Sequence, residues 1–188
     1  MKKVLAVFTA ALVAMNLYAQ KTTVAVGEVA GGSNVNNNRV ETLRSLIISG
    51  LSASPRLNVL DVKNLGMTTS AVKLEELQKY NVEVLVTAKI NSMSGSSEYK
   101  DGKYNYKAEM LYVITLTDTS TGQVIGTKEK HHYGSSTENS ESAFASTFTL
   151  IDEDMKRLQD RFTILSILEG KNHAASASRN QTDQERMA

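Results

Sequence analysis

Two neighbouring histidines are the side chains of this sequence best suited to metal binding or proton transfer. His131 and His132 fall in a segment whose composition predicts a strand, where neighbouring side chains point to opposite faces. They cannot easily share a metal ion, and the third histidine, His173, lies near the C-terminus. The chain has no cysteine, which removes thiolate ligands and thiol nucleophiles. We predict no metal site and interpret the two histidines as half-exposed strand residues.

Glycines and serines offer two further kinds of chemistry. Gly27, Gly31 and Gly32 follow a predicted strand and precede a predicted helix, which is where a phosphate-binding loop would lie. The segment lacks both the Gly-Lys-Ser/Thr ending and the Gly-x-Gly-x-x-Gly spacing, so we interpret it as a flexible turn and predict no cofactor. None of the many serines lies in a nucleophile elbow, so we predict no catalytic residue and no enzyme activity.

Tyrosines suggest binding instead of catalysis. Tyr99, Tyr104 and Tyr106 cluster around a predicted hairpin turn, and Tyr133 follows the two histidines. Tyrosine is favoured at protein interfaces because it combines a large contact area with a hydrogen-bonding end. We take these four residues, with His131, as the candidate protein interface; the alternative is cross-strand packing that stabilises the hairpin.

The first half of the chain predicts strands that alternate with helices. A helix capped by Asn38, with Glu41 in the capping-box position, extends to Pro55, and a weaker, peripheral helix spans about residues 70–80. Three strands flank these helices, the second buried on most of both faces and the third central in the sheet: residues 22–29, 57–62 and 82–92.

The second half predicts an antiparallel meander closed by a helix. Asp101-Gly102 is a strong two-residue hairpin signal, because both turn positions tolerate positive φ. A long return strand follows, with Ala108, Met110, Tyr112, Ile114 and Leu116 on one face, then a strand from Gln123 to about Tyr133. Apolar residues at steps of three and four predict a helix over residues 140–162, and residues 164–168 could add a last strand. The predicted fold is α/β (α+β), a single mixed sheet of order β-α-β-α-β-β-β-α-β with helices packed on it.

The N-terminus predicts export. Lys2 and Lys3, an apolar stretch of about 12 residues, and the small and polar residues Ala19 and Gln20 have the layout of a cleaved signal peptide over residues 1–19. The stretch is too short to cross a bilayer as a helix. We therefore expect a periplasmic protein, with release from the cell as the alternative, made of one domain over residues 20–170 and a disordered tail over residues 171–188.

Charge gives no sign of an electrostatic partner. Cleavage after Ala19 would reduce the 21 basic residues to 19, against 20 acidic ones. A near-neutral domain lacks the basic footprint of a nucleic-acid binder and the polybasic patch of a membrane-surface protein. We therefore predict no nucleic-acid partner.

Several segments resemble the domain family shared by the curli secretion channel CsgG and the penicillin-binding-protein activator LpoB. The similarity covers roughly residues 22–165, and order and spacing carry most of it: residues 24–26, 43–51, 57–62, 81–90 and 116–125. Two departures stand out. Asn81-Val82-Glu83 occupies the position of the family's Gly-Ala-Asp, and the chain has no cysteine for lipidation.

The resemblance implies a periplasmic, non-enzymatic accessory or assembly protein that binds a cell-envelope protein or forms a homo-oligomer. A membrane pore is not expected, because the strands around Asp101-Gly102 and from Gln123 to Tyr133 carry charges on their faces and leave no apolar band for lipid. A component of a ring-forming secretion scaffold is one alternative function. The other is an envelope hydrolase or small-ligand binder with an unrecognised site, which loss of an activity on substitution of His131 or His132 would favour.

Overall fold

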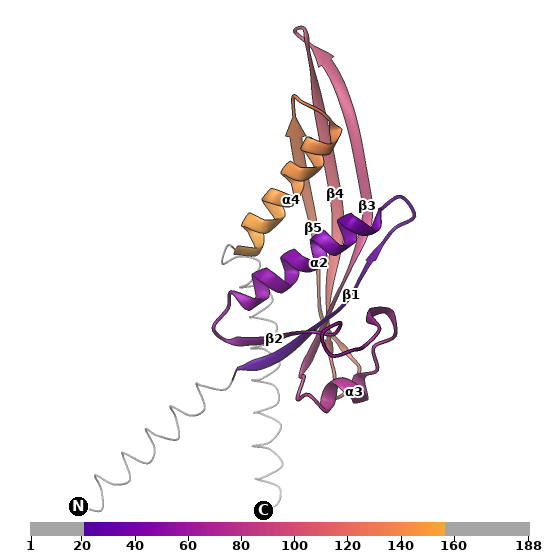
Figure 1. The fold of residues 1–188 in the computed structure, drawn as a ribbon, viewed down its shortest axis with the longest axis vertical. Coiled ribbons are helices and arrows are strands. Elements are labelled where there is room, and N and C mark those ends of the chain that lie inside the picture. Colours follow the sequence, from indigo (N-terminus) through magenta and orange to yellow (C-terminus); the bar gives the residue numbers. More distant parts are fainter. Residues whose placement is uncertain (1–20, 157–188) are drawn as a thin grey trace, which may run out of the picture.

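The computed structural model describes residues 21–156 (Figure 1). In that range it contains five strands, three α-helices and one short 3₁₀ helix. In chain order these are β1 (Thr22–Gly31), α2 (Asn37–Ser52), β2 (Leu57–Asp61), η1 (Thr69–Ala71), α3 (Leu74–Gln78), β3 (Val84–Lys100), β4 (Lys103–Asp118), β5 (Val124–Ser136) and α4 (Ser140–Lys156). The predicted signal peptide, the last strand over residues 164–168 and the C-terminal tail lie outside the described residues.

The strands form one mixed sheet in the order β2-β1-β3-β4-β5. β1 pairs in parallel with both β2 and β3, whereas β3–β4 and β4–β5 are antiparallel. The predicted mixed sheet is confirmed, and β3 is its central strand. The first crossover connects β1 to β2 through α2. The second leads from β2 through η1 and α3 to β3, on the other side of β1. Two crossovers of the same hand that run in opposite directions place their helices on opposite faces.

The two long helices cover one face of the sheet (Figure 1). The main core joins fully buried side chains of α2 and α4 to the alternate residues of the central strands: Leu43, Ile47, Leu51, Ile151, Val84, Val86, Ile90, Met110, Tyr112 and Leu116. The predicted alternation of β4 is therefore confirmed. Burial of a side chain of this size contributes roughly 1.5–3 kcal/mol, so this face is the main source of stability.

The start of α2 and the burial of β2 differ from expectation. Asn36, not Asn38, caps the helix, with its Oδ1 accepting the N–H of Arg39 at 3.0 Å. The predicted capping box was wrong, since Glu41 reaches Lys63 instead (2.7 Å). β2 is an edge strand and is largely half-buried, because β1 pairs with only one side of it.

The second predicted helix divides into η1 and α3 and is not peripheral. Leu77 of α3 is fully buried and packs with Ala25 and Leu85 on the face of the sheet opposite α2. Val82 belongs to this second cluster too, whereas Val84 belongs to the main core, so the two residues lie on different faces although they are two positions apart. The segment caps one end of the sheet (Figure 1).

β3 extends well beyond its predicted end at residue 92 and continues to Lys100. A register shift against β4 between Ile90 and Ser92 marks a bulge at Asn91. After the bulge, Met93 and Gly95 lie on the helix-covered face and the intervening serines lie on the other. The extended strands form a hairpin that projects past α4 (Figure 1).

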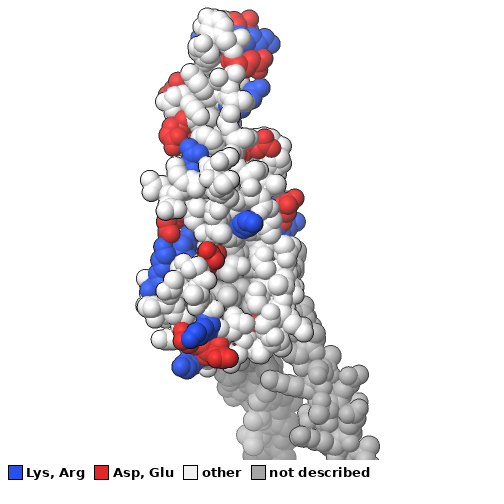
Figure 2. Space-filling model, turned by 90° about the vertical axis from the view of Figure 1, so that its right-hand side faces the viewer, with Lys and Arg blue, Asp and Glu red and all other residues white. Residues whose placement is uncertain are grey.

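No helix within residues 21–156 is long and apolar enough to span a membrane. On the side of the molecule that Figure 2 shows, acidic and basic side chains are interspersed, without a large area of one sign. This distribution agrees with the near-neutral charge of the sequence.

Candidate interaction surfaces

The distal hairpin, residues 97–106, carries three of the five predicted interface residues. β5 stops pairing with β4 at Tyr106, so the tip is a two-stranded ribbon. Asp101 and Gly102 form its turn with φ of 51° and 78°, as predicted for a two-residue hairpin. Tyr99 lies directly opposite Tyr104, with ring centroids 4.9 Å apart, and both side chains are exposed (64% and 52%).

Tyr106 has a different role from the two outer tyrosines. Its ring stacks on that of Tyr104, with centroids 5.9 Å apart. Unlike Tyr104, it is half-buried and packs against a small cluster formed by Ala108 of β4 and by Ala143 and Phe144 of α4. Tyr106 therefore anchors the ladder of tyrosine rings to the body of the protein. The cross-strand packing foreseen as the alternative is present, and it leaves the outer two rings available for contact.

His131 and Tyr133 lie together on β5, with Glu109 of β4 beside them. The ring centroids of His131 and Tyr133 are 4.4 Å apart, and the Tyr133 hydroxyl is 3.1 Å from His131 Nδ1. Glu109 Oε1 contacts His131 Nε2, and both side chains are substantially exposed (43% and 40%). Both imidazole nitrogens thus have partners within the cluster. Sequence reasoning missed Glu109, because its position opposite Tyr133 depends on the β4–β5 register.

The two predicted patches face opposite sides of the sheet. The tyrosines of the hairpin lie on the side of α4, whereas His131 and Tyr133 pair with Leu111 and Glu109 on the other side. A single partner surface therefore cannot easily cover all five residues.

His132 lies on the helix-covered face and corrects one expectation. It is 7% exposed and stacks on Tyr112, with ring centroids 5.8 Å apart, so it is a core residue and not a half-exposed one. The two histidines point to opposite faces, as predicted. Within residues 21–156, no group of three or more His, Asp and Glu side chains could hold a metal ion.

The glycine-containing loop after β1 uses its backbone internally. The N–H of Gly32 donates to Ile90 O (3.1 Å), and the N–H of Val35 donates to Gly32 O (3.0 Å). These amides are therefore not directed at a phosphate site, which agrees with a plain turn.

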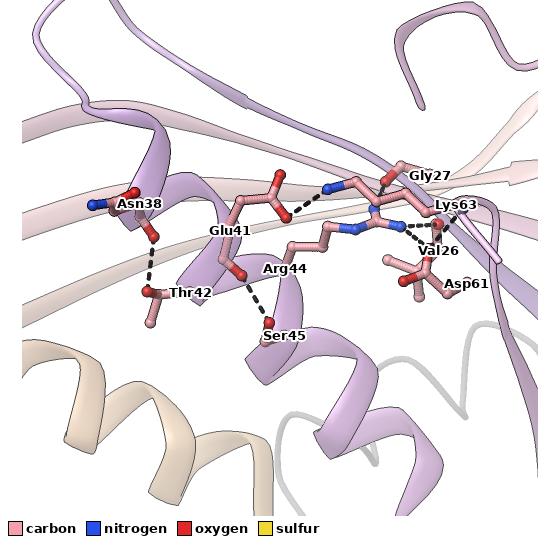
Figure 3. A network of polar contacts seen from close by, with 9 residues as sticks. All are labelled: Val26, Gly27, Asn38, Glu41, Thr42, Arg44, Ser45, Asp61 and Lys63. Carbon is pink, nitrogen blue, oxygen red and sulfur yellow. Dashed lines mark hydrogen bonds and ion pairs between the residues drawn. The ribbon is translucent and has the colours of Figure 1, made fainter. Parts of the chain in front are cut away.

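A buried arginine beside the middle of β1 and the carboxyl end of β2 was missed from the sequence (Figure 3). Arg44 of α2 is 3% exposed, and its guanidinium donates to the carbonyls of Val26 (3.2 Å) and Gly27 and to Asp61 Oδ1. Asp61 also accepts the N–H of Lys63 at 2.8 Å. The signal was the position of Arg44, four residues after Val40 on the apolar stripe of the helix. All its partners belong to the fold itself, so this is a structural network.

No family model matches the chain, and no curated protein matches it. Solved structures do share its fold. A PelC dodecamer from Paraburkholderia phytofirmans aligns with 16% identity and a TM-score of 0.50, over 72% of this chain and 87% of that one. A putative neuraminyllactose-binding hemagglutinin homolog from Helicobacter pylori aligns with 8% identity and a TM-score of 0.54, over 85% and 91%. A Xanthomonas campestris protein of family DUF330 aligns with 8% identity and a TM-score of 0.52, over 84% and 91%. At such identities the similarity concerns the fold alone.

Proposed function

We propose that this protein is an exported, non-enzymatic accessory or assembly protein of the CsgG/LpoB-like type, which acts in the periplasm by binding another protein of the cell envelope. The observation that carries the proposal is the exposed pair of Tyr99 and Tyr104 on a hairpin that projects beyond the rest of the fold (Figure 1). The signal-like residues 1–19 support export, and the similarity over residues 22–165 supports the type.

The hairpin has the physical properties of a binding element. Tyr99 and Tyr104 offer large amphipathic rings that are already ordered by mutual contact and by stacking on Tyr106, so binding costs little side-chain entropy. Exposed aromatic pairs of this kind are typical centres of protein interfaces. Lys100 and Lys103 beside the turn add polar groups that keep the free protein soluble.

The test is capture of partners by the full-length tagged protein from its native cell envelope after mild crosslinking, with the captured proteins identified by mass. The variant is Tyr99→Ser/Tyr104→Ser, which keeps the turn and the anchor Tyr106. We expect this variant to capture at least about tenfold less of a stoichiometric envelope partner than the wild type, because a central aromatic pair typically contributes about 2 kcal/mol or more to binding.

The matched control is Tyr80→Ser, which removes an exposed tyrosine (46%) at the other end of the molecule, after α3. Equal capture by the wild type, the control and the hairpin variant would place the contact elsewhere. Recovery of only the protein itself, at a defined multiple, would contradict the accessory function and favour a self-assembled scaffold.

A further inference from the structure

The face of β3, β4 and β5 that points away from α2 and α4 is here called the open face. Its apolar centre is formed by Leu111 and Val113 of β4, which are both half-buried. The segment around α3 packs on Ala25 and Leu85, toward the other end of this side of the sheet. Within residues 21–156, no helix covers the rows around Leu111 and Val113.

Opposite charges lie on the two sides of this apolar centre, at the same level of the sheet. Val113 pairs with Lys89 of β3 on one side and with Glu129 of β5 on the other. Both charged residues are exposed. They are two strand spacings apart, about 10 Å, with Val113 between them. Neither forms an ion pair within the part of the chain that the structure describes.

Side-chain size is distributed in the same complementary way. In the next two rows, β3 contributes the small residues Ser92 and Ser94, whereas β5 contributes the bulky His131 and Tyr133. Tyr133 is 61% exposed. In these rows the open face carries a lysine and small side chains on β3, and a glutamate and bulky side chains on β5. Glu109 of β4 lies between Ser94 and Tyr133 and is paired with His131.

We propose that the open face binds a second copy of this chain, face to face, about a twofold axis parallel to β4. Such an axis places β3 of one protomer over β5 of its partner. Lys89 then faces the partner's Glu129, Ser92 and Ser94 receive His131 and Tyr133, and Leu111 and Val113 meet their own copies. A twofold interface must be self-complementary. The row of Lys89 and Glu129 is complementary in charge, and the rows of Ser92, Ser94, His131 and Tyr133 are complementary in size. Glu109 of β4 lies near the axis and meets its own copy, with each carboxylate already paired with His131 of its own protomer. Packed sheets lie about 10 Å apart, a distance that lysine and glutamate side chains can bridge.

The footprint sets the expected strength. Three strands over about ten residues cover about 14 by 33 Å, or roughly 450 Å² per protomer. A stable interface typically buries about 800 Å² per partner, so we expect a weak dimer that forms at about 100 μM and dissociates near 1 μM. The alternative occupant is water, because antiparallel sheets commonly have one solvated face.

The first test is sedimentation of the purified full-length protein over this concentration range, with charge reversals. We expect Lys89→Glu and Glu129→Lys each to weaken dimerisation at least about tenfold, because each creates a like-charge contact. The double variant should recover to within about threefold of the wild type. Lys128→Glu is the matched control, since Lys128 is an exposed charge on β5 that pairs with the buried face of β4, and it should leave dimerisation unchanged. Failure of the double variant to recover association would overturn the proposed geometry.

The second test uses the absence of cysteine from the chain. Val113→Cys would place one thiol near the axis, where it meets its own copy, and Lys128→Cys would place one on the other face. With a short bis-maleimide we expect the first variant to give a crosslinked dimer at least about tenfold faster than the second. Equal rates, or a wild type that stays monomeric at 100 μM, would overturn the proposal. Both tests use the purified protein alone, so their outcome is independent of the envelope partner.

Discussion

At the scale of single residues, Arg44 contributes more to this fold than its sequence position suggested. Its guanidinium connects α2 to the backbone of β1 and to Asp61 at the end of β2 (Figure 3). A charge that is 97% removed from solvent is tolerated because its donors are bonded on several sides. The network holds α2 at a fixed position on the parallel strands β1 and β2. In this position the apolar residues Leu43, Ile47 and Leu51 of the helix face the core.

Removal of Asp61 tests the importance of this buried pair. Asp61→Ala would leave the guanidinium with backbone carbonyls alone, so we expect the free energy of unfolding to fall by about 2–3 kcal/mol. Urea denaturation followed by circular dichroism measures this. The control is Glu98→Ala, which breaks an exposed pair with Lys107 (59% and 55%) and should cost less than about 1 kcal/mol. Similar losses in the two variants would mean that the buried pair contributes no special stability.

At the scale of elements, the position of α4 depends on one glycine of β5. A Cβ added at Gly134 would lie 2.3 Å from Ala143 O and 2.6 Å from Thr147 N. The helix backbone therefore approaches the strand more closely than any side chain would permit. This close approach buries Phe144 and Ile151 against the sheet, and it places the start of α4 beneath the tyrosine ladder.

Gly134→Ala should therefore destabilise the protein. Alanine would ordinarily stabilise a strand slightly by lowering the entropy of the unfolded chain, but here it must displace helix backbone. We expect a loss of about 2–3 kcal/mol in the free energy of unfolding, measured by thermal or urea denaturation. Ser135→Ala, at the neighbouring exposed position, should change it by less than about 0.5 kcal/mol. A neutral or stabilising Gly134→Ala would show that α4 can move away at no cost.

At the scale of the whole molecule, a rigid body and a projecting hairpin are built from the same two strands. Near Ile90 and Tyr112 the strands are central in the sheet and covered by both long helices. Between Glu98 and Asn105 they form an isolated ribbon with water on both faces. Stability should therefore decrease along β3 and β4 toward the tip.

Hydrogen exchange in the native protein checks this gradient. Two-stranded ribbons are marginally stable in water, so we expect the amides of residues 98–105 to exchange at least about 100-fold faster than those of residues 86–90 and 110–116. Tyr104→Ser should accelerate exchange at the tip further, because it removes the contact between the rings of Tyr99 and Tyr104. Uniform protection along both strands would contradict the gradient.

The sequence by itself determined the elements and much of their burial. The alternation from Ala108 to Leu116 indicated one buried face of β4, and Asp101-Gly102 indicated the hairpin turn; both are confirmed. The exposed Tyr99 and Tyr104 could also be proposed from their place beside this turn. These features depend on side-chain periodicity and on backbone preferences within a few residues, which are local properties of the chain.

Only the tertiary structure decided which of these elements meet and which faces they share. The bulge at Asn91 sets the face on which Tyr99 of the hairpin lies, and the β4–β5 register brings Glu109 to His131. The ion pair of Arg44 and Asp61 joins residues on separate elements. Each of these contacts arises from long-range strand pairing and helix docking, whose energies depend on how distant segments fit together. No pattern in a short stretch of sequence contains that information.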